Sequence, residues 1–166
     1  MNSMSVCQIK VQTVRESPVA YFVRSSSDVK NLWDNEITKS VMFEPEKEMV
    51  FVLMVNARNR IISYNLVSMG SLDSSIVEPR EVFRPAIASA ARSIILLHNH
   101  PSGNMTPSAE DISITKKMIE SGKILGIHVL DHVIVSSSNQ NGYGDGYGDG
   151  NAEILSLRES GMIMFC

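Results

Sequence analysis

The sequence has few cysteines, no long apolar run and no large excess of charge of either sign. Its two cysteines, Cys7 and Cys166, are too few and too far apart for a disulfide framework or a zinc knuckle, so we expect reduced thiols. No hydrophobic signal sequence or membrane-spanning run is seen, which predicts a cytoplasmic protein that does not enter membranes. The net charge of −3 argues against a broad basic surface for DNA, although DNA remains among the partners considered.

What is present fits one ordinary globular domain. The chain has 166 residues, of which 43% are hydrophobic and 20% charged, enough to bury a core. Short apolar runs alternate with segments of helical period, which predicts an α/β protein with a mixed sheet. We expect strands at 7–14, 49–55, 61–68, 94–97 and 128–136, and helices at 27–36, 79–91 and 108–121.

Two histidines follow the apolar run at 94–97. Four branched aliphatic residues in a row are typical of a strand buried on both faces. Side chains two residues apart on a strand share a face, so His98 and His100 should point the same way at its end. Turn residues at 101–103 then end the strand.

The helix expected at 108–121 begins with the N-cap residue Ser108 and should end at Gly122. At 100° per residue, Asp111 falls on its apolar arc. A carboxylate that faces inward is costly unless it is paired, hydrogen-bonded or bound to a metal. His98 and His100, on the preceding strand, supply a reason for its position.

Two imidazoles, one carboxylate and a water would complete a four-coordinate Zn²⁺ site formed by His98, His100 and Asp111. Such a site activates water and polarises a carbonyl, and the Ser108 hydroxyl is placed to donate to an oxyanion. Each part also has a simpler explanation. A His-x-His pair is often only hydrogen-bonded, and Ser108 with Asp111 resembles a capping box.

The joint pattern resembles the JAMM signature of JAB1/MPN-type metalloproteases, which has His-x-His-Pro followed by a serine and, three residues later, an aspartate. The sequence is most similar to the bacterial RadC-like branch. Three further segments resemble that branch, namely 79–83, 131–135 and 156–161. The resemblance covers about 37–164. It departs from the family at Glu78, where a histidine is usual, and the chain is too short for the N-terminal helical module of full-length RadC proteins.

The resemblance implies a three-layer α/β/α fold with the cytidine-deaminase-like architecture of MPN domains. We expect that domain at 37–166, with 1–36 as a strand and helix packed on it. The resemblance also implies a glutamate as general base before the central strand. Glu44, Glu46 and Glu48 are the candidates, and we favour Glu48 because it directly precedes the strand, as in the RadC-like pattern.

The implied activity is zinc-dependent hydrolysis of an amide bond in a peptide or protein substrate. The alternatives are a DNA repair or recombination factor, of the kind found on mobile elements, and a non-catalytic MPN-like scaffold. Intact His98, His100, Ser108 and Asp111 argue against the scaffold. The sequence does not choose an oligomeric state.

Two further features remain open. Asp131 and His132 lie on an apolar strand, where a histidine is usually a satisfied core residue. Their match to the RadC-like pattern raises the alternative of a partner to the metal ligands. The Tyr-Gly-Asp-Gly repeat at 142–150 predicts a flexible loop, with a cover over the active site or a calcium site as the alternatives.

Overall fold

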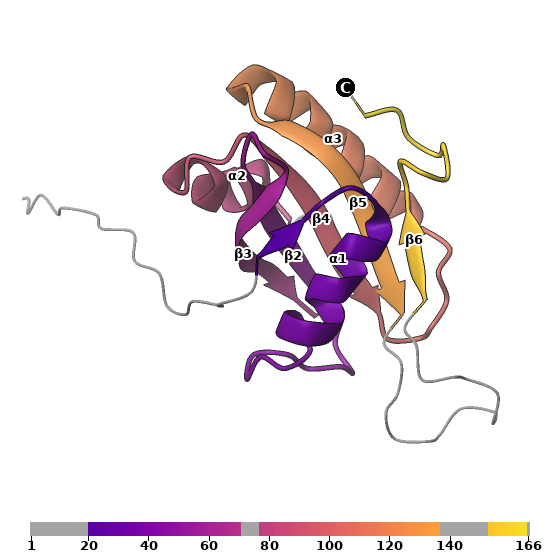
Figure 1. Cartoon of the computed structure of the whole chain (residues 1–166). Helices are drawn as coiled ribbons and strands as arrows, with labels where there is room; N and C mark the ends of the chain where they lie inside the picture. The colour runs from indigo at the N-terminus through magenta and orange to yellow at the C-terminus, as the bar shows by residue number, and fades with distance from the viewer. Residues whose placement is uncertain (1–19, 71–76, 137–152, 166) are drawn as a thin grey trace, which may run out of the picture.

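A six-stranded mixed sheet forms the centre of the computed structural model, which describes residues 20–70, 77–136 and 153–165 (Figure 1). The strand order is β1-β3-β2-β4-β5-β6. Only β4 and β5 run parallel, and the other neighbours are antiparallel. The strands are β1 Tyr21–Phe22, β2 Met49–Val55, β3 Arg60–Met69, β4 Ser93–His100, β5 His128–Ser136 and β6 Ile154–Ser156. This confirms the α/β class with a mixed sheet, in which β2 and β3 form a hairpin.

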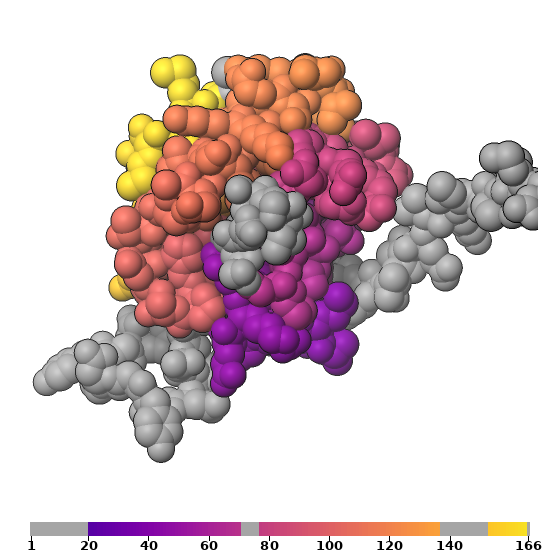
Figure 2. Space-filling model, turned by 180° about the vertical axis from the view of Figure 1, so that it is seen from behind, coloured from indigo at the N-terminus to yellow at the C-terminus, as the bar shows by residue number. Residues whose placement is uncertain are grey.

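Helices pack on both faces of this sheet. Helix α1, Ser26–Leu32, continues into the π-helical turn η1, Trp33–Ile37, and covers one face. Helices α2, Pro79–Ala88, and α3, Ala109–Leu125, cover the other face, which Figure 2 shows. Every residue of β2 is buried, and its side chains alternate between the two apolar clusters. Burial on both faces explains why β2 reads as an unbroken apolar run.

Two predicted helix ends are wrong, and the packing of a glycine explains the first. Helix α3 does not end at Gly122 but continues to Leu125, with Gly126 at its C-cap in the left-handed conformation, φ 69°. Gly122 instead allows the backbone of Ile127 to approach closely, because a Cβ at residue 122 would lie 2.4 Å from the carbonyl oxygen of Ile127. Helix α2 ends at Ala88 rather than at residue 91. Strand β4 runs on to His100, so both histidines lie within the strand.

Other expectations fall on parts of the chain that are not described. The strand at 7–14, the repeat at 142–150 and both cysteines lie outside the described residues. Among the described segments, β1 pairs with the start of β3, and η1 places Trp33 and Ile37 in the core. No described helix is both long enough and apolar enough to cross a membrane.

Candidate metal centre

Four side chains converge at one end of the sheet. His98 and His100 come from the end of β4, Asp111 from the first turn of α3, and Glu48 from the residue before β2. The antiparallel register pairs Val50 with His98, which brings Glu48 across from His100. One ligand atom from each of the four residues can be chosen so that all lie within 4.8 Å of one another. The structure therefore brings together residues that the sequence separates by more than sixty positions.

The geometry of this group suits a metal ion. The Nε2 atoms of His98 and His100 are 2.8 Å apart, and Asp111 Oδ1 lies 3.3 Å from His98 Nε2. Asp111 Oδ1 is buried and makes no hydrogen bond in the described part of the chain. Two tetrahedral ligands of Zn²⁺ lie about 3.3 Å apart when each bond is about 2.0 Å. An unsatisfied buried carboxylate oxygen beside two imidazole nitrogens is a donor set that can hold a divalent metal ion.

The capping interactions at the start of α3 hold Asp111 in place. The Ser108 N–H and hydroxyl donate to Asp111 Oδ2 at 2.7 and 2.8 Å, and the Asp111 N–H donates back to Ser108 Oγ at 3.0 Å. The capping-box interpretation is therefore confirmed, and it leaves Oδ1 turned toward the histidines. In this arrangement the Ser108 hydroxyl already has an acceptor, so its role toward an oxyanion stays a prediction.

Each histidine is also held from its other side. The Nδ1 atom of His100 contacts the backbone carbonyl of Asn104. His98 Nδ1 lies 2.8 Å from Nε2 of His132, whose Nδ1 contacts the Thr115 hydroxyl. His132 is thus a buried core residue and a partner of His98 at the same time. Asn104 and Thr115 were not predicted from the sequence, although Thr115 stands one helical turn after Asp111.

Burial and neighbouring charges shift the pKa values of the three histidines and Asp111 in different directions. Burial lowers the pKa of His98 well below its usual value, and burial lowers the pKa of His132 to about 4. The nearby Asp111 carboxylate raises the pKa of His100. Burial alone would raise the pKa of Asp111, but the nearby imidazoles of His100 and His98 and the two hydrogen bonds from Ser108 outweigh it and hold that pKa well below its usual range. A charged Asp111 carboxylate beside the neutral, buried imidazole of His98 favours the binding of a cation.

The lowered pKa of His132 predicts that the metal-free protein loses stability in mild acid. Between pH 6.5 and about 4, His132 is protonated in the unfolded chain but neutral in the folded protein. The free energy of unfolding therefore falls as the pH falls. At about 1.36 kcal/mol for each unit of pKa, the loss is roughly 3 kcal/mol, and His98 adds to it in the same direction. Urea unfolding at pH 7 and pH 5, in chelator, should show a smaller difference for His132→Asn than for wild type. An identical difference in both would contradict the assignment.

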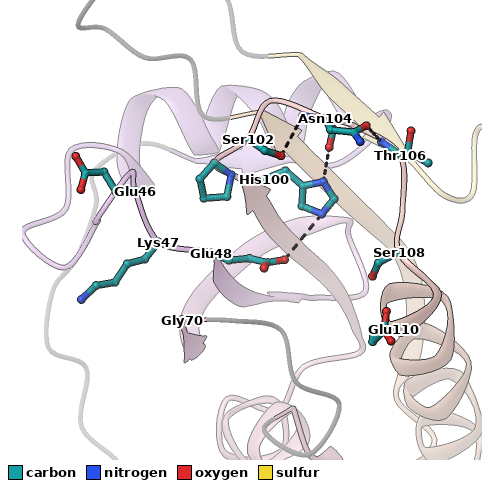
Figure 3. Close-up of a pocket in the computed structure, with 11 residues that line it drawn as sticks. Glu46, Lys47, Glu48, Gly70, His100, Ser102, Asn104, Thr106, Ser108 and Glu110 are labelled. Atoms are coloured by element: carbon teal, nitrogen blue, oxygen red, sulfur yellow. Dashed lines mark hydrogen bonds and ion pairs between the residues drawn. The ribbon is translucent and has the colours of Figure 1, made fainter. Parts of the chain in front are cut away.

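Two of the four residues, Glu48 and His100, line a cleft of about 770 Å³, whereas His98 and Asp111 are buried and do not line it. In Figure 3, Glu48 points across it toward His100, while Ser108 and Glu110 stand on the opposite wall. Of the three acids considered as general base, only Glu48 belongs to the converging group. Glu46 lines the cleft but points away from His100 in this view, and Glu44 forms an ion pair with Lys47 at 2.6 Å. The role of Glu48 stays a prediction, now with a position that suits it.

The fold and the site together define an α/β domain with a candidate metal centre. The sequence model of the RadC-like JAB domain matches residues 23–144, and the chain therefore belongs to the RadC-like JAB domain family. The match begins earlier in the chain than the resemblance at 37–164, and it includes α1 and η1.

Individual relatives agree with this assignment. The chain is 48% identical to a UPF0758 protein of Caldanaerobacter subterraneus over 145 residues, which is 87% of this chain and 54% of that protein. It is 43% identical over 122 residues to a UPF0758 protein of Methanosarcina barkeri, covering 74% and 47%, and 46% identical over 118 residues to one of Alkaliphilus metalliredigens, covering 71% and 49%. The chain thus spans about half the length of these curated relatives. Because archaeal proteins are among the relatives, the family does not fix a bacterial source.

Proposed function

We propose that this chain is a zinc-dependent hydrolase that cleaves an amide bond, in a peptide or an isopeptide, with water as the nucleophile. The observation that supports this most is the unsatisfied buried Oδ1 of Asp111, which faces the Nε2 atoms of two histidines. Hydrolysis by water also needs a general base, and the Glu48 carboxylate lies beside the histidines on the cleft side. Its Oε1 atom is 3.9 Å from the Nε2 atom of each.

Each residue has a role that its position suits. His98, His100 and Asp111 would hold Zn²⁺ through Nε2, Nε2 and Oδ1. When bound there, zinc would polarise the amide carbonyl and lower the pKa of water. Glu48 takes a proton from the attacking water and returns it to the leaving amine. For Ser108 to assist an oxyanion, its hydroxyl has to turn away from Asp111 Oδ2, which keeps the bond from the Ser108 N–H.

The charge of the cleft favours an amide over a phosphodiester substrate. Glu46, Glu48 and Glu110 line it, and Lys47, the one lysine or arginine among the lining residues, is paired with Glu44. An acidic wall repels the phosphates of DNA, whose binding depends on neutralisation by lysine and arginine. A peptide or protein substrate carries no such penalty. A role in DNA repair or recombination would then depend on a surface other than this cleft.

We propose as well that the fold is the three-layer α/β/α architecture of JAB1/MPN domains, which is cytidine-deaminase-like. The two apolar clusters on opposite faces of the sheet support this, because each is covered by its own helices.

The proposal is tested by hydrolysis of fluorogenic peptides and isopeptide-linked peptides by the zinc-loaded chain. Activity should disappear in chelator, return with zinc and be absent from His100→Ala, whose side chain is only partly buried and whose loss the fold should tolerate. Equal activity of wild type and His100→Ala would overturn the proposal. Cleavage of DNA but of no amide would replace it with the alternative of a DNA repair or recombination factor.

A further inference from the structure

A chain of hydrogen bonds leads away from the candidate metal centre into the core. His98 Nδ1 lies 2.8 Å from His132 Nε2, His132 Nδ1 contacts Thr115 Oγ1, and Thr115 Oγ1 donates to the Asp111 carbonyl at 2.6 Å. The three side chains are 0%, 2% and 0% exposed for His98, His132 and Thr115. This series of hydrogen bonds therefore connects β4, β5 and α3 in a part of the core without solvent. It ends at the backbone of Asp111, whose carboxylate belongs to the site.

The last acceptor in this series of hydrogen bonds, the Asp111 carbonyl, determines which group donates at each step. A carbonyl oxygen only accepts, so the single hydroxyl proton of Thr115 goes to Asp111 and Thr115 Oγ1 must accept from His132 Nδ1–H. A neutral His132 then has no proton on Nε2, which must accept from His98 Nδ1–H. A neutral His98 in turn has no proton on its own Nε2. Each step follows from the number of protons available.

From this geometry we infer that Thr115 and His132 are positioning residues, which fix His98 as its Nδ1–H tautomer and leave the Nε2 lone pair directed at Asp111 Oδ1 and His100 Nε2. The inference rests on the zinc site of the proposed function. Ligating histidines usually donate their second N–H to a carboxylate, carbonyl or water. Here the immediate acceptor is another histidine, which can accept or donate, so its tautomer has to be set by a further group.

The opposite direction would disable the site. If Thr115 donated to His132 Nδ1, the bond to the Asp111 carbonyl would be lost and His132 Nε2–H would donate to His98. His98 would then carry its proton on Nε2, where it faces the other ligands and blocks a cation. The Thr115 hydroxyl is thus the group that selects between a binding and a non-binding state of a residue it does not touch.

The tautomers are read directly from ¹⁵N chemical shifts and ¹⁵N–¹H couplings of the histidine rings in metal-free protein, held in chelator. Both His98 and His132 should be Nδ1–H tautomers. Thr115→Val, which has the same shape but no hydroxyl, should mix the tautomers and weaken zinc binding roughly 10- to 100-fold in a chelator competition. Thr115→Ser, which keeps the hydroxyl, should restore both to near wild type.

Ser121→Ala is the matched control. Ser121 makes the same kind of bond to the carbonyl four residues before it, on the same helix but away from the site, so its loss should leave tautomers and zinc affinity unchanged. An Nε2–H tautomer at His98 in wild type would overturn the inference. Wild-type zinc affinity in Thr115→Val, or equal loss in Thr115→Ser, would do the same. Absent hydrolysis with the expected tautomers would count against the proposed function alone.

Discussion

Asp111→Asn is expected to abolish stable zinc binding, whereas the wild-type chain should keep about one zinc per chain after dialysis. The substitution preserves the size of the side chain and an acceptor for the Ser108 N–H, but it removes the charge that opposes the cation and weakens the oxygen ligand. Each of the three protein ligands contributes to the free energy of metal binding, so loss of one leaves little affinity. Metal content by mass spectrometry, after dialysis at neutral pH, measures the effect.

The control has to separate ligation from helix capping, since Asp111 does both. Ser108→Gly removes the hydroxyl that donates to Asp111 Oδ2 but leaves the carboxylate, and glycine at an N-cap costs only a few tenths of a kcal/mol. It should keep zinc. Zinc retained by Asp111→Asn would show that the buried Oδ1 serves the helix and not a metal. Equal loss of zinc from both variants would show that zinc binding depends on the ordered first turn of α3 and not on the Asp111 carboxylate as a ligand.

The local part of the site was predictable, and residue spacing explains why. His98 and His100 share a face because a strand alternates, and Asp111 turns inward because a helix repeats every 3.6 residues. These relations need no knowledge of the rest of the chain. The residues by themselves suggested zinc but left it beside simpler explanations, and the family resemblance favoured it over them.

What depends on distant packing was not predictable in the same way. The contact between His132 and Thr115 requires β5 to lie parallel to β4 beneath α3, which neither segment encodes alone. The end of α3 was misjudged for the same reason. Gly122 has the chemistry of a helix stop, but the close approach of the Ile127 carbonyl gives that glycine another use, and Gly126 ends the helix.

Glu48→Gln is expected to bind zinc as well as wild type and to lose hydrolysis by roughly 10²- to 10⁴-fold. The amide fills the same space and keeps one oxygen, but it neither takes a proton from water nor gives one to an amine. Glu48 Oε1 lies 3.9 Å from the Nε2 atom of each histidine, whereas Asp111 Oδ1 lies 3.3 Å from that of His98. On this spacing we expect Glu48 to act as a base beside the ligands and not as a ligand. The measurements are zinc content and kcat on the same preparation.

Glu44→Gln is the matched control, because it makes the same change at another of the three candidate acids. Glu44 is about half exposed and paired with Lys47, an arrangement that contributes little to stability, and it does not line the cleft. It should retain wild-type activity. Loss of zinc from Glu48→Gln would make Glu48 a ligand, and full activity would move the base elsewhere. Loss confined to kcat would mean that the register of β2 against β4, which carries Glu48 to the histidines, is what makes the metal centre catalytic.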